Sequence, residues 1–520
     1  MHLQLLLGSR LSRGGILGRT SKFVLNAIST ALLQIVTMVA GFITPRFLLV
    51  AYGSDINGLI SSINQFIVYF NLVEAGLSSA AVYSLYKPIA EHNYKQINRV
   101  VVAARNFYVK SGFIFVGLVF LLAFIYPWIT HTEVLDKGTV FCLVLVLGVN
   151  GALEFFTLAK YRALLTADQK TYVISTASIV YTILNTLVVV VLSTLRVDIL
   201  LLRVVALISI FARSLILYIY IKIHYKFIDY KVAPDNSAMD KRWSALYLQV
   251  VQTVQNASPA VLTTLFSTLK MVSVYSVYNM VLAGINGVMS VFSTGVSAGF
   301  GELLVKKDTK AFRKAYKDFE YLYYMAMSIV YGVTMATILP FIQVYTKGVN
   351  DVQYVNLIFA VLFVFNGVLY NLKTPQGMLV IAAGLYKETR IQSTIQAGIL
   401  VVGGVILGYL FGLTGVMVAS CLSNFYRCID LLFFIPKNVT HLPILPSFQR
   451  MVETLAVIIL ICIASCLCIP FHPNTLITWV GYAFCNLIMA VLLVILFHVL
   501  FERRNIHIAV DRICSIFKRK

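Results

Sequence analysis

Fourteen long apolar stretches divide this chain of 520 residues, and they constrain its fold more than any other feature. A helix needs about 20 apolar residues to cross a hydrocarbon layer of roughly 30 Å, at about 1.5 Å per residue. Hydrophobic residues make up 59% of the chain and charged residues only 12%, unlike any soluble domain. The sequence therefore predicts an all-α polytopic membrane protein. The predicted spans are 24–49, 58–84, 110–130, 139–165, 172–194, 199–221, 245–267, 273–300, 321–345, 354–383, 391–411, 414–435, 451–470 and 475–500.

The distribution of Lys and Arg indicates how the chain is oriented. These residues outnumber Asp and Glu by 42 to 21, and they gather in alternate loops, such as 87–110 and 306–317, and near both ends. Loops on the cytoplasmic side of multi-pass proteins carry this positive excess. Both termini are therefore predicted to lie in the cytoplasm. Because topology explains the positive charge, nucleic-acid binding is not predicted.

The loops on the opposite side are short and offer no domain for catalysis. They are Ala51–Asn57, Thr130–Gly138, Phe266–Lys270 and Gly412–Thr414. The eight cysteines show no metal-ligand spacing and no disulfide framework. The chain also lacks a G-x-x-x-x-G-K-[ST] run, which excludes an ATP-driven pump in a single chain. The protein is therefore not predicted to be an enzyme, and no metal or other cofactor is expected.

The sequence repeats itself at an offset of about 215 residues. The matched pairs are Asn64 with Asn279, Asn150 with Asn366, and Arg213 with Arg427. A nearly constant offset along the chain indicates an internal duplication, here of six spans. Because six is an even number, both halves start on the same side of the membrane. This predicts two parallel six-helix repeats, lobes around a central cavity, followed by two C-terminal helices.

These observations predict six segments along the chain. The N-terminal segment carries basic residues after a short apolar patch and has no cleavage site, so it is predicted to be a tail and not a signal peptide. The last two spans are either a lateral addition that contacts lipid or a partner, or simple anchors. The segments are a basic cytoplasmic tail (1–23), a first lobe (24–222), a cytoplasmic linker (223–244), a second lobe (245–436), spans 13 and 14 (451–500), and a second basic cytoplasmic tail (501–520).

Ionisable residues inside the spans are the candidate functional residues. They are costly in hydrocarbon and by default face a cavity or a partner. Most of them are basic, which favours an anionic ligand. They are Arg46, Glu74, Glu154, Lys160, Arg162, Arg203, Arg213, Glu302, Lys373, Arg427 and Asp430.

Several of these basic residues have a simpler alternative role. Arg46 either lines the cavity or extends to the lipid headgroups. Lys160 and Arg162 are either cavity residues or ordinary positive flanks of span 4. Arg213 and Arg427 occupy matching positions and are either gates or snorkelling arginines.

The acidic and amide candidates also leave two interpretations open. Glu74 lies deep in a span, which favours a cavity or ion-pair role, whereas Glu302 ends a span and is either a boundary residue or a gate. Asp430 follows Arg427 by three residues, so the two are expected to pair on one helix face. Asn64, Gln65 and Asn279 either bind hydroxyl groups or hold helices together.

One long segment carries a resemblance to a known family. The stretch TPRFLLVAYGSDINGLISSINQFIVYFNLVEAGLSSAAVYSLYKPIAE (Thr44–Glu91) resembles the start of the bacterial polysaccharide repeat-unit flippases, the Wzx-type (O-antigen) members of the MOP exporter superfamily. Lipid II flippases and MATE antiporters belong to the same superfamily. IAAGLYKETR (Ile381–Arg390) is similar to the family's segment between spans 10 and 11, and LLTADQKTYV (Leu164–Val173) parallels it. The resemblance is strongest over residues 22–110 and is collinear through residue 435.

The resemblance implies a flippase. Such a protein moves undecaprenyl-diphosphate-linked oligosaccharide from the inner to the outer leaflet of the bacterial cytoplasmic membrane by alternating access, for surface polysaccharide biosynthesis. The expected partners are this cargo, membrane lipids and the polysaccharide polymerase machinery, with a monomer as the transport unit. The alternatives are a MATE-like multidrug or cation antiporter, whose cavity should be acidic and aromatic, and a lipid II flippase.

Roles for the candidate residues follow from this cargo. Guanidinium and ammonium groups bind phosphate oxygens through charge-assisted hydrogen bonds. The residues expected to line the substrate cavity are Arg46, Lys160, Arg162, Lys373, Asn64, Gln65 and Asn279. Those expected to act in gating, ion pairing or coupling are Glu74, Arg213, Glu302, Arg427 and Asp430. Coupling to a proton or sodium gradient is left open, with Glu74 as the best acidic candidate.

Overall fold

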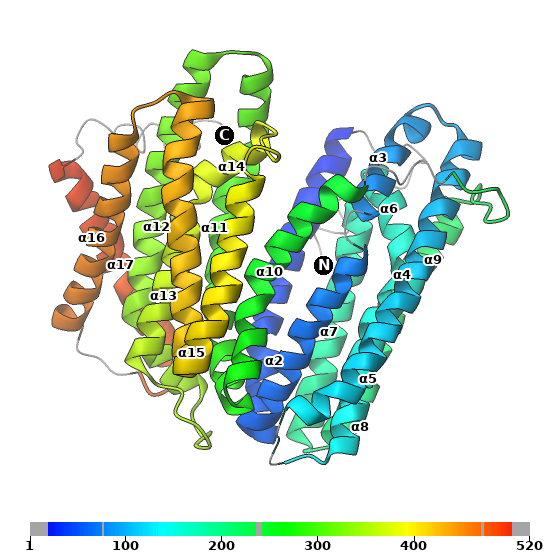
Figure 1. Ribbon diagram of the computed structural model, residues 1–520, viewed down its shortest axis with the longest axis horizontal. Helices are drawn as coiled ribbons and strands as arrows, with labels where there is room; N and C mark the ends of the chain where they lie inside the picture. The colour runs from blue at the N-terminus through cyan, green and yellow to red at the C-terminus, as the bar shows by residue number, and fades with distance from the viewer. Residues whose placement is uncertain are drawn as a thin grey trace, which may run out of the picture. The chain divides into compact units, whose positions relative to one another are not determined.

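The computed structural model describes residues 19–74, 77–130, 132, 134–235, 242–469 and 473–501. Within these ranges every regular element is a helix, from α2 (Arg19–Phe70) to α17 (Leu476–Phe501) (Figure 1). The prediction of an all-α protein is confirmed. Most of the two predicted basic tails and residues 236–241 of the predicted linker lie outside the described residues.

The number of helical crossings agrees with the sequence. Eleven helical segments of the described chain are long and apolar enough to cross a membrane. Two of them, Val24–Glu74 and Arg390–Thr440, contain 51 residues each, which is enough for two crossings. A further helix, α10 (Arg242–Phe266), has 25 residues and falls outside that set. With the two long segments counted twice and α10 included, the fourteen predicted spans are present.

Two predicted loops are wrong, because at each of them the helix is interrupted at a single glycine only. The chain is helical on both sides of Gly53 (φ 80°, ψ 179°) in α2 and of Gly412 (φ 56°, ψ −135°) in α15 (Arg390–Ile435). Side chains with a Cβ rarely adopt these angles. At the first break, Asp351 caps the new helix start by accepting the Ser54 N–H (2.8 Å) and the Ser54 hydroxyl (2.5 Å). The loops predicted at Ala51–Asn57 and Gly412–Thr414 are therefore single-residue breaks.

Four other predicted spans are interrupted. Span 6 is broken at Leu207, between α8 (Ile199–Ala206) and α9 (Ile208–His224), and each of the other three interruptions includes a candidate residue. Span 2 contains a 3₁₀ turn (Asn71–Glu74), span 4 a π-helical turn (Glu154–Leu158), and span 10 a break at Lys373. Interrupted helices within a membrane are tolerated where protein or a cavity satisfies the backbone. The remaining helices are α3 (Leu77–Ala90), α4 (Tyr94–Ile129), α5 (Lys137–Leu153), α6 (Ala159–Ala167), α7 (Thr171–Thr194), α11 (Leu269–Val305), α12 (Thr309–Tyr345), α13 (Leu357–Leu372), α14 (Thr374–Ala382) and α16 (Ile444–Cys468).

The backbone turns confirm the internal repeat. Residues with a left-handed φ recur at an offset of 215 or 216: His92 and Lys307, Gln169 and Gly384, and Arg196 and Gly412. The hydrogen bonds around the first two pairs are equivalent. In the first pair the turn closes from Asn93 N to Pro88 O (2.9 Å) in one half and from Asp308 N to Leu303 O (3.2 Å) in the other. This is the Schellman pattern that ends a helix, so both halves reverse direction by the same local structure.

Contacts divide the chain into two compact units. The first contains Met1–Thr44, Phe70–Phe124 and Phe141–Val250, and the second contains Pro45–Tyr69, Ile125–Val140 and Val251–Lys520. The second unit thus includes part of α2 as well as α11 to α17.

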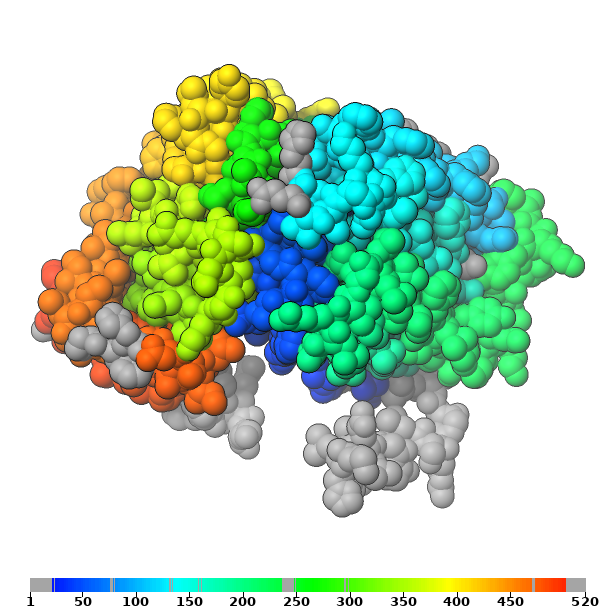
Figure 2. All heavy atoms as spheres, turned by 90° about the horizontal axis from the view of Figure 1, so that it is seen from below, coloured from blue at the N-terminus to red at the C-terminus, as the bar shows by residue number. Residues whose placement is uncertain are grey.

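The two C-terminal helices pack on α12 within the second unit (Figure 1). Ile461 of α16 and Val494 of α17 are fully buried in an apolar cluster with side chains of α12. A buried ion pair adds to this packing, because Arg450 Nη1 lies 3.1 Å from Glu320 Oε2, and Ser447 donates to both oxygens of the same carboxylate. In the space-filling view, orange C-terminal residues border yellow-green residues of this unit (Figure 2).

Candidate functional site

Three candidate residues of the first unit meet at one point. Glu154 opens the π-helical turn between α5 and α6, Arg162 lies on α6, and Arg213 lies on α9. Arg162 Nη1 is 2.5 Å from Glu154 Oε1, and Arg213 Nη2 is 3.0 Å from the same oxygen. One carboxylate thus neutralises two guanidinium groups only in part, and the cluster keeps one net positive charge.

The cluster is partly open to ligands. The side chains of Glu154 and Arg162 are 33% and 35% exposed, whereas that of Arg213 is only 12% exposed. The Arg213 guanidinium lies 5.5 Å from the ring centroid of Tyr181, whose face stabilises the cation. Its Nε atom is buried and has no hydrogen-bond partner among the residues that the structure describes. Arg213 is therefore held in place by Glu154 and Tyr181.

Two other candidates belong to the same region of the chain. Glu74, half-buried in its 3₁₀ turn, interacts electrostatically with Arg162 and Glu154. Lys160 lies on α6, but its side chain is outside the described part of the structure.

The second unit contains a cavity of about 280 Å³ with a polar lining. Helices α10, α11, α13 and α15 contribute seven amide side chains, together with serine and tyrosine hydroxyls. Amides offer both donors and acceptors without a net charge, so this lining suits a neutral ligand rich in hydroxyl groups. The polar side chains are Gln255, Asn256, Tyr275, Asn279, Asn286, Asn366, Tyr370, Gln396, Ser420, Ser423 and Asn424.

Asn424 organises one wall of this amide cavity. Its Oδ1 accepts hydrogen bonds from Lys373 Nζ (2.5 Å) and Gln396 Nε2 (3.3 Å), and its Nδ2 donates to Asn366 Oδ1 (2.9 Å). The Oγ atom of Ser420 is buried and has no partner within the described residues. Buried polar groups are normally paired, so the wall retains a hydrogen-bonding position for a ligand.

Arg427 and Asp430 form an ion pair on α15. Arg427 Nη1 is 2.5 Å from Asp430 Oδ2, and their side chains are 8% and 15% exposed. This arginine occupies the position that matches Arg213, but its partner lies on its own helix. Its charge is therefore satisfied locally.

The remaining predicted residues lie away from these two places. Arg46 donates to the backbone oxygen of Lys347 (2.9 Å) and lies over the Tyr345 ring. Asn64 is exposed and Gln65 is half-buried on α2.

Glu302 lies near the end of α11 and pairs with Lys306 one helical turn later, at 2.6 Å. Both side chains are 65% exposed. The hydrogen bond and the charge of Lys306 lower the pKa of the Glu302 carboxyl below its usual range.

The structure groups the predicted residues in ways that spacing did not indicate. Arg162 was expected to line the substrate cavity and Arg213 to act in gating or ion pairing, but the two share one partner. Glu154 was named among the ionisable residues of the spans, but no role was predicted for it. Asn424 was missed, because a single amide in an apolar stretch has no distinctive pattern. Asn366 was marked only by its match to Asn150 in the repeat.

Comparison of the sequence with known proteins finds no match, either to a family profile or to a curated protein. The fold, in contrast, is similar to those of solved MOP-superfamily transporters. The lipid II flippase MurJ in an inward closed conformation gives a TM-score of 0.68 at 16% identity, covering 93% of this chain and 100% of that chain. An inward-facing MATE family multidrug resistance transporter gives a TM-score of 0.62 at 13% identity, covering 81% of this chain and 96% of that chain. The MATE multidrug transporter DinF-BH gives a TM-score of 0.57 at 17% identity, covering 81% of this chain and 96% of that chain. The chain therefore has the MOP-type fold of a multi-pass membrane protein.

Proposed function

We propose that this protein is a transporter that flips undecaprenyl-diphosphate-linked oligosaccharide from the inner to the outer leaflet of the bacterial cytoplasmic membrane. The flipped repeat units serve surface polysaccharide biosynthesis. The fold shared with MurJ and MATE transporters supports a transport function. The cargo is inferred from the side chains of the two places described above.

The convergence of Arg162 and Arg213 on one oxygen of Glu154 carries the proposal. A diphosphate that links a lipid to a sugar is a divalent anion at neutral pH. A planar guanidinium group binds phosphate through two parallel N–H···O hydrogen bonds. The two arginines are close enough together to contact a single diphosphate. Their partial exposure allows a lipid headgroup to reach them.

Glu154 acts in this mechanism as a built-in substitute for phosphate. Two unpaired guanidinium groups within the membrane layer are costly, so an internal carboxylate stabilises them while no cargo is bound. The incoming diphosphate takes its place on the arginines. When cargo leaves, Glu154 rebinds them and lowers the cost of release.

The amide cavity of the second unit is proposed to recognise sugar. Sugar hydroxyls both donate and accept hydrogen bonds, as the seven amide side chains do. The cavity volume of about 280 Å³ corresponds to a small ligand or one part of a larger one.

A MATE-like antiporter for organic cations is less consistent with these features. A cation site should present an excess of acidic groups together with aromatic groups. In the first-unit cluster the acidic residues Glu154 and Glu74 do not outnumber the two arginines, and the side chains that line the amide cavity are uncharged. The MATE structures also cover 81% to 84% of this chain, against 93% for MurJ. A lipid II flippase is the second candidate, because the MurJ similarity favours it.

Further parts of the proposal concern the cellular setting. We propose that both termini lie in the cytoplasm, that the monomer is the transport unit, and that the cargo passes on to polysaccharide polymerase machinery. Glu74 is the proposed residue for coupling to a proton or sodium gradient, since it interacts with the Glu154 cluster. The chain is proposed to have no enzymatic activity of its own.

Reconstitution into liposomes tests the proposal directly. Fluorescent undecaprenyl-diphosphate oligosaccharide is expected to move between leaflets, and a proton or sodium gradient applied in parallel reveals the coupling. Lipid II movement without oligosaccharide movement would select the second candidate. Uptake of a fluorescent organic cation without any lipid movement would select the antiporter.

A further inference from the structure

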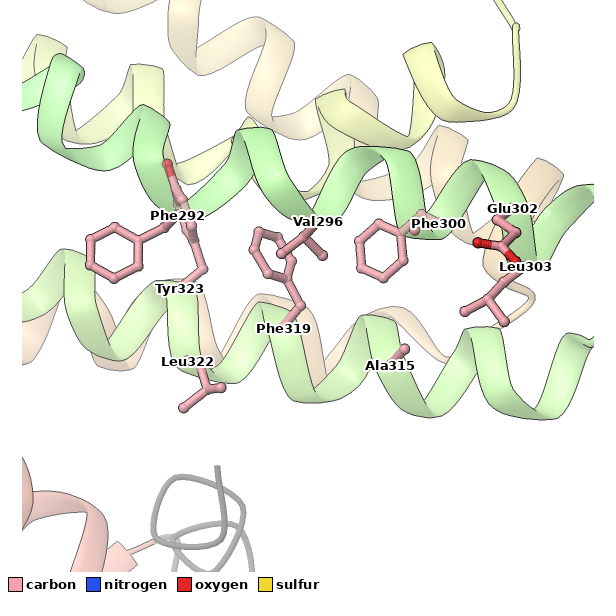
Figure 3. Close-up of a pocket in the computed structure, with 10 residues that line it drawn as sticks. Phe292, Val296, Phe300, Glu302, Leu303, Ala315, Phe319, Leu322 and Tyr323 are labelled. Atoms are coloured by element: carbon pink, nitrogen blue, oxygen red, sulfur yellow. The ribbon is translucent and has the colours of Figure 1, made fainter. Parts of the chain in front are cut away.

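An apolar groove runs between α11 and α12 in the second unit (Figure 3). Its volume is about 480 Å³. Phe292, Val296 and Phe300 of α11 lie in a row beside Phe319 of α12, while Glu302 and Leu303 lie at one end (Figure 3). Phe292 is 47% exposed, so the groove opens at the surface of the protein. Exposed apolar surfaces of this kind mark sites where lipid or protein partners bind.

The length of the groove matches one leaflet. From Phe292 to Leu303 the helix advances eleven residues, about 16 Å at about 1.5 Å per residue. Half of a hydrocarbon layer of roughly 30 Å is about 15 Å. One acyl chain of a phospholipid extends over this distance, whereas a 55-carbon isoprenoid chain is several times too long for it.

Positive charge gathers beyond one end of this groove. The end marked by Glu302 and Leu303 continues into the turn at Lys306–Asp308 and the start of α12. Glu302 is already paired with Lys306, which reduces its repulsion of an anion. Over residues 302–318 six basic residues exceed three acidic ones. The exposed lysines of this region are Lys306, Lys307, Lys310, Lys314 and Lys317.

We propose that the groove binds one acyl chain of an anionic phospholipid, with the phosphate of the headgroup held by the lysines between Lys306 and Lys317. Apolar lining at one end and cations at the other complement the two parts of such a lipid. Basic residues next to a membrane helix attract anionic headgroups in this way. The site is separate from the cargo residues, and the inference does not depend on which cargo the protein carries.

Gly299 allows the groove to be filled without disturbing the helix. It lines the groove, and a Cβ added there meets no atom within 4 Å. Gly299→Leu should therefore place its side chain in the space of the acyl chain. Gly481→Leu on α17 is the matched control, because Gly481 is also an exposed helical glycine with nothing within 4 Å of its added Cβ.

Native mass spectrometry of the delipidated full-length protein measures the binding. Phosphatidylglycerol is expected to bind about 100-fold more tightly than phosphatidylcholine, because each lysine near the headgroup contributes about 1 kcal/mol. Gly299→Leu should weaken phosphatidylglycerol binding at least fivefold and Gly481→Leu should leave it unchanged. Changing both Lys310 and Lys314 to Gln should weaken only the anionic lipid, by about fivefold for each charge removed.

Three outcomes would overturn the proposal. The first is equal binding of phosphatidylglycerol to the Gly299→Leu and Gly481→Leu variants. The second is equal binding of phosphatidylglycerol and phosphatidylcholine to the unchanged protein. The third is tighter binding of undecaprenyl phosphate than of phosphatidylglycerol at the same site. If Gly299→Leu does not yield folded protein, Ala315→Leu on the opposite wall provides the same test. Loss of phosphatidylglycerol binding with intact cargo flipping would leave the transport proposal standing.

Discussion

The two halves of this protein have matching backbone turns, but their side chains form different interactions. Their turns recur at an offset of 215 or 216 with equivalent hydrogen bonds, yet the matched arginines have different partners. Arg213 binds Glu154 on another helical segment, whereas Arg427 binds Asp430 on its own helix. A duplicated fold thus supplies two similar frameworks whose side chains can diverge.

The same divergence is visible one step away from the arginines. Tyr181 in the first half contacts Arg213, and Gln396, at an offset of 215, belongs to the amide cavity of the second half. At these matched positions the first half has an arginine–glutamate cluster and the second half has a cavity lined by neutral amides. This difference suits an amphipathic cargo that has an anionic and a neutral polar part.

The largest expected effect concerns the arginines of the first half. Arg162→Gln should reduce flipping of a diphosphate-linked lipid by about 10- to 100-fold, because a hydrogen bond to a charged group contributes about 1.5–3 kcal/mol. Flipping in liposomes measures the loss. The double variant Arg427→Gln and Asp430→Asn removes the self-contained pair and should change flipping less than threefold. Equal losses in the two halves would show that the difference between them has no functional meaning.

Asn366 and Asn150, which occupy matching positions in the two repeats, should respond differently to substitution by leucine. Asn366→Leu leaves the amide of Asn424 without its acceptor, which should destabilise the protein by about 1–3 kcal/mol. Asn150→Leu removes only a long contact of 3.4 Å to Tyr181 and should cost less than about 0.5 kcal/mol. Thermal unfolding in detergent measures both. A larger cost at Asn150 would contradict the role assigned to the amide cavity.

Removing the charge of Glu154 tests whether it competes with phosphate. Glu154→Gln should strengthen pyrophosphate binding about fivefold, since a partly exposed ion pair is worth up to about 1 kcal/mol. The substitution should also slow flipping, because no carboxylate is left to rebind the arginines when the cargo leaves. Calorimetric titration with pyrophosphate measures the affinity. Asp136→Asn is the control, because Asp136 is an exposed carboxylate outside the cluster that bonds Gly138 and Thr139. Weaker pyrophosphate binding to Glu154→Gln would exclude the proposed competition.

The smallest expected effect lies in the matched turns at Gln169 and Gly384. Both residues have a left-handed φ, of 57° and 70°. Gly384→Ala should destabilise the protein by about 1 kcal/mol, because its added Cβ meets no atom but the conformation is strained. Gln169→Gly should stabilise it by up to about 1 kcal/mol for the converse reason. Unfolding midpoints that move in the same direction would show that the two turns are not equivalent.

The sequence predicted the fold well where the signal lies in a long stretch of residues. Spans and repeat offset are read from many residues at once, so single errors do not change them. Loop ends depend on one residue, and here the predictions failed at Gly53 and Gly412, since a single glycine breaks the helix and the residues after it are already helical.

The sequence by itself determined that the chain is a polytopic all-α membrane protein with two six-helix repeats, because hydrocarbon imposes length and apolar composition on every span. It also supplied the excess of basic residues within the spans. Only the tertiary structure decided which of them meet. Glu154 and Arg162 lie eight residues apart across a π-helical turn, and Lys373 reaches Asn424 on a distant helix. Such contacts depend on how interrupted helices pack, and no local pattern of residues encodes that packing.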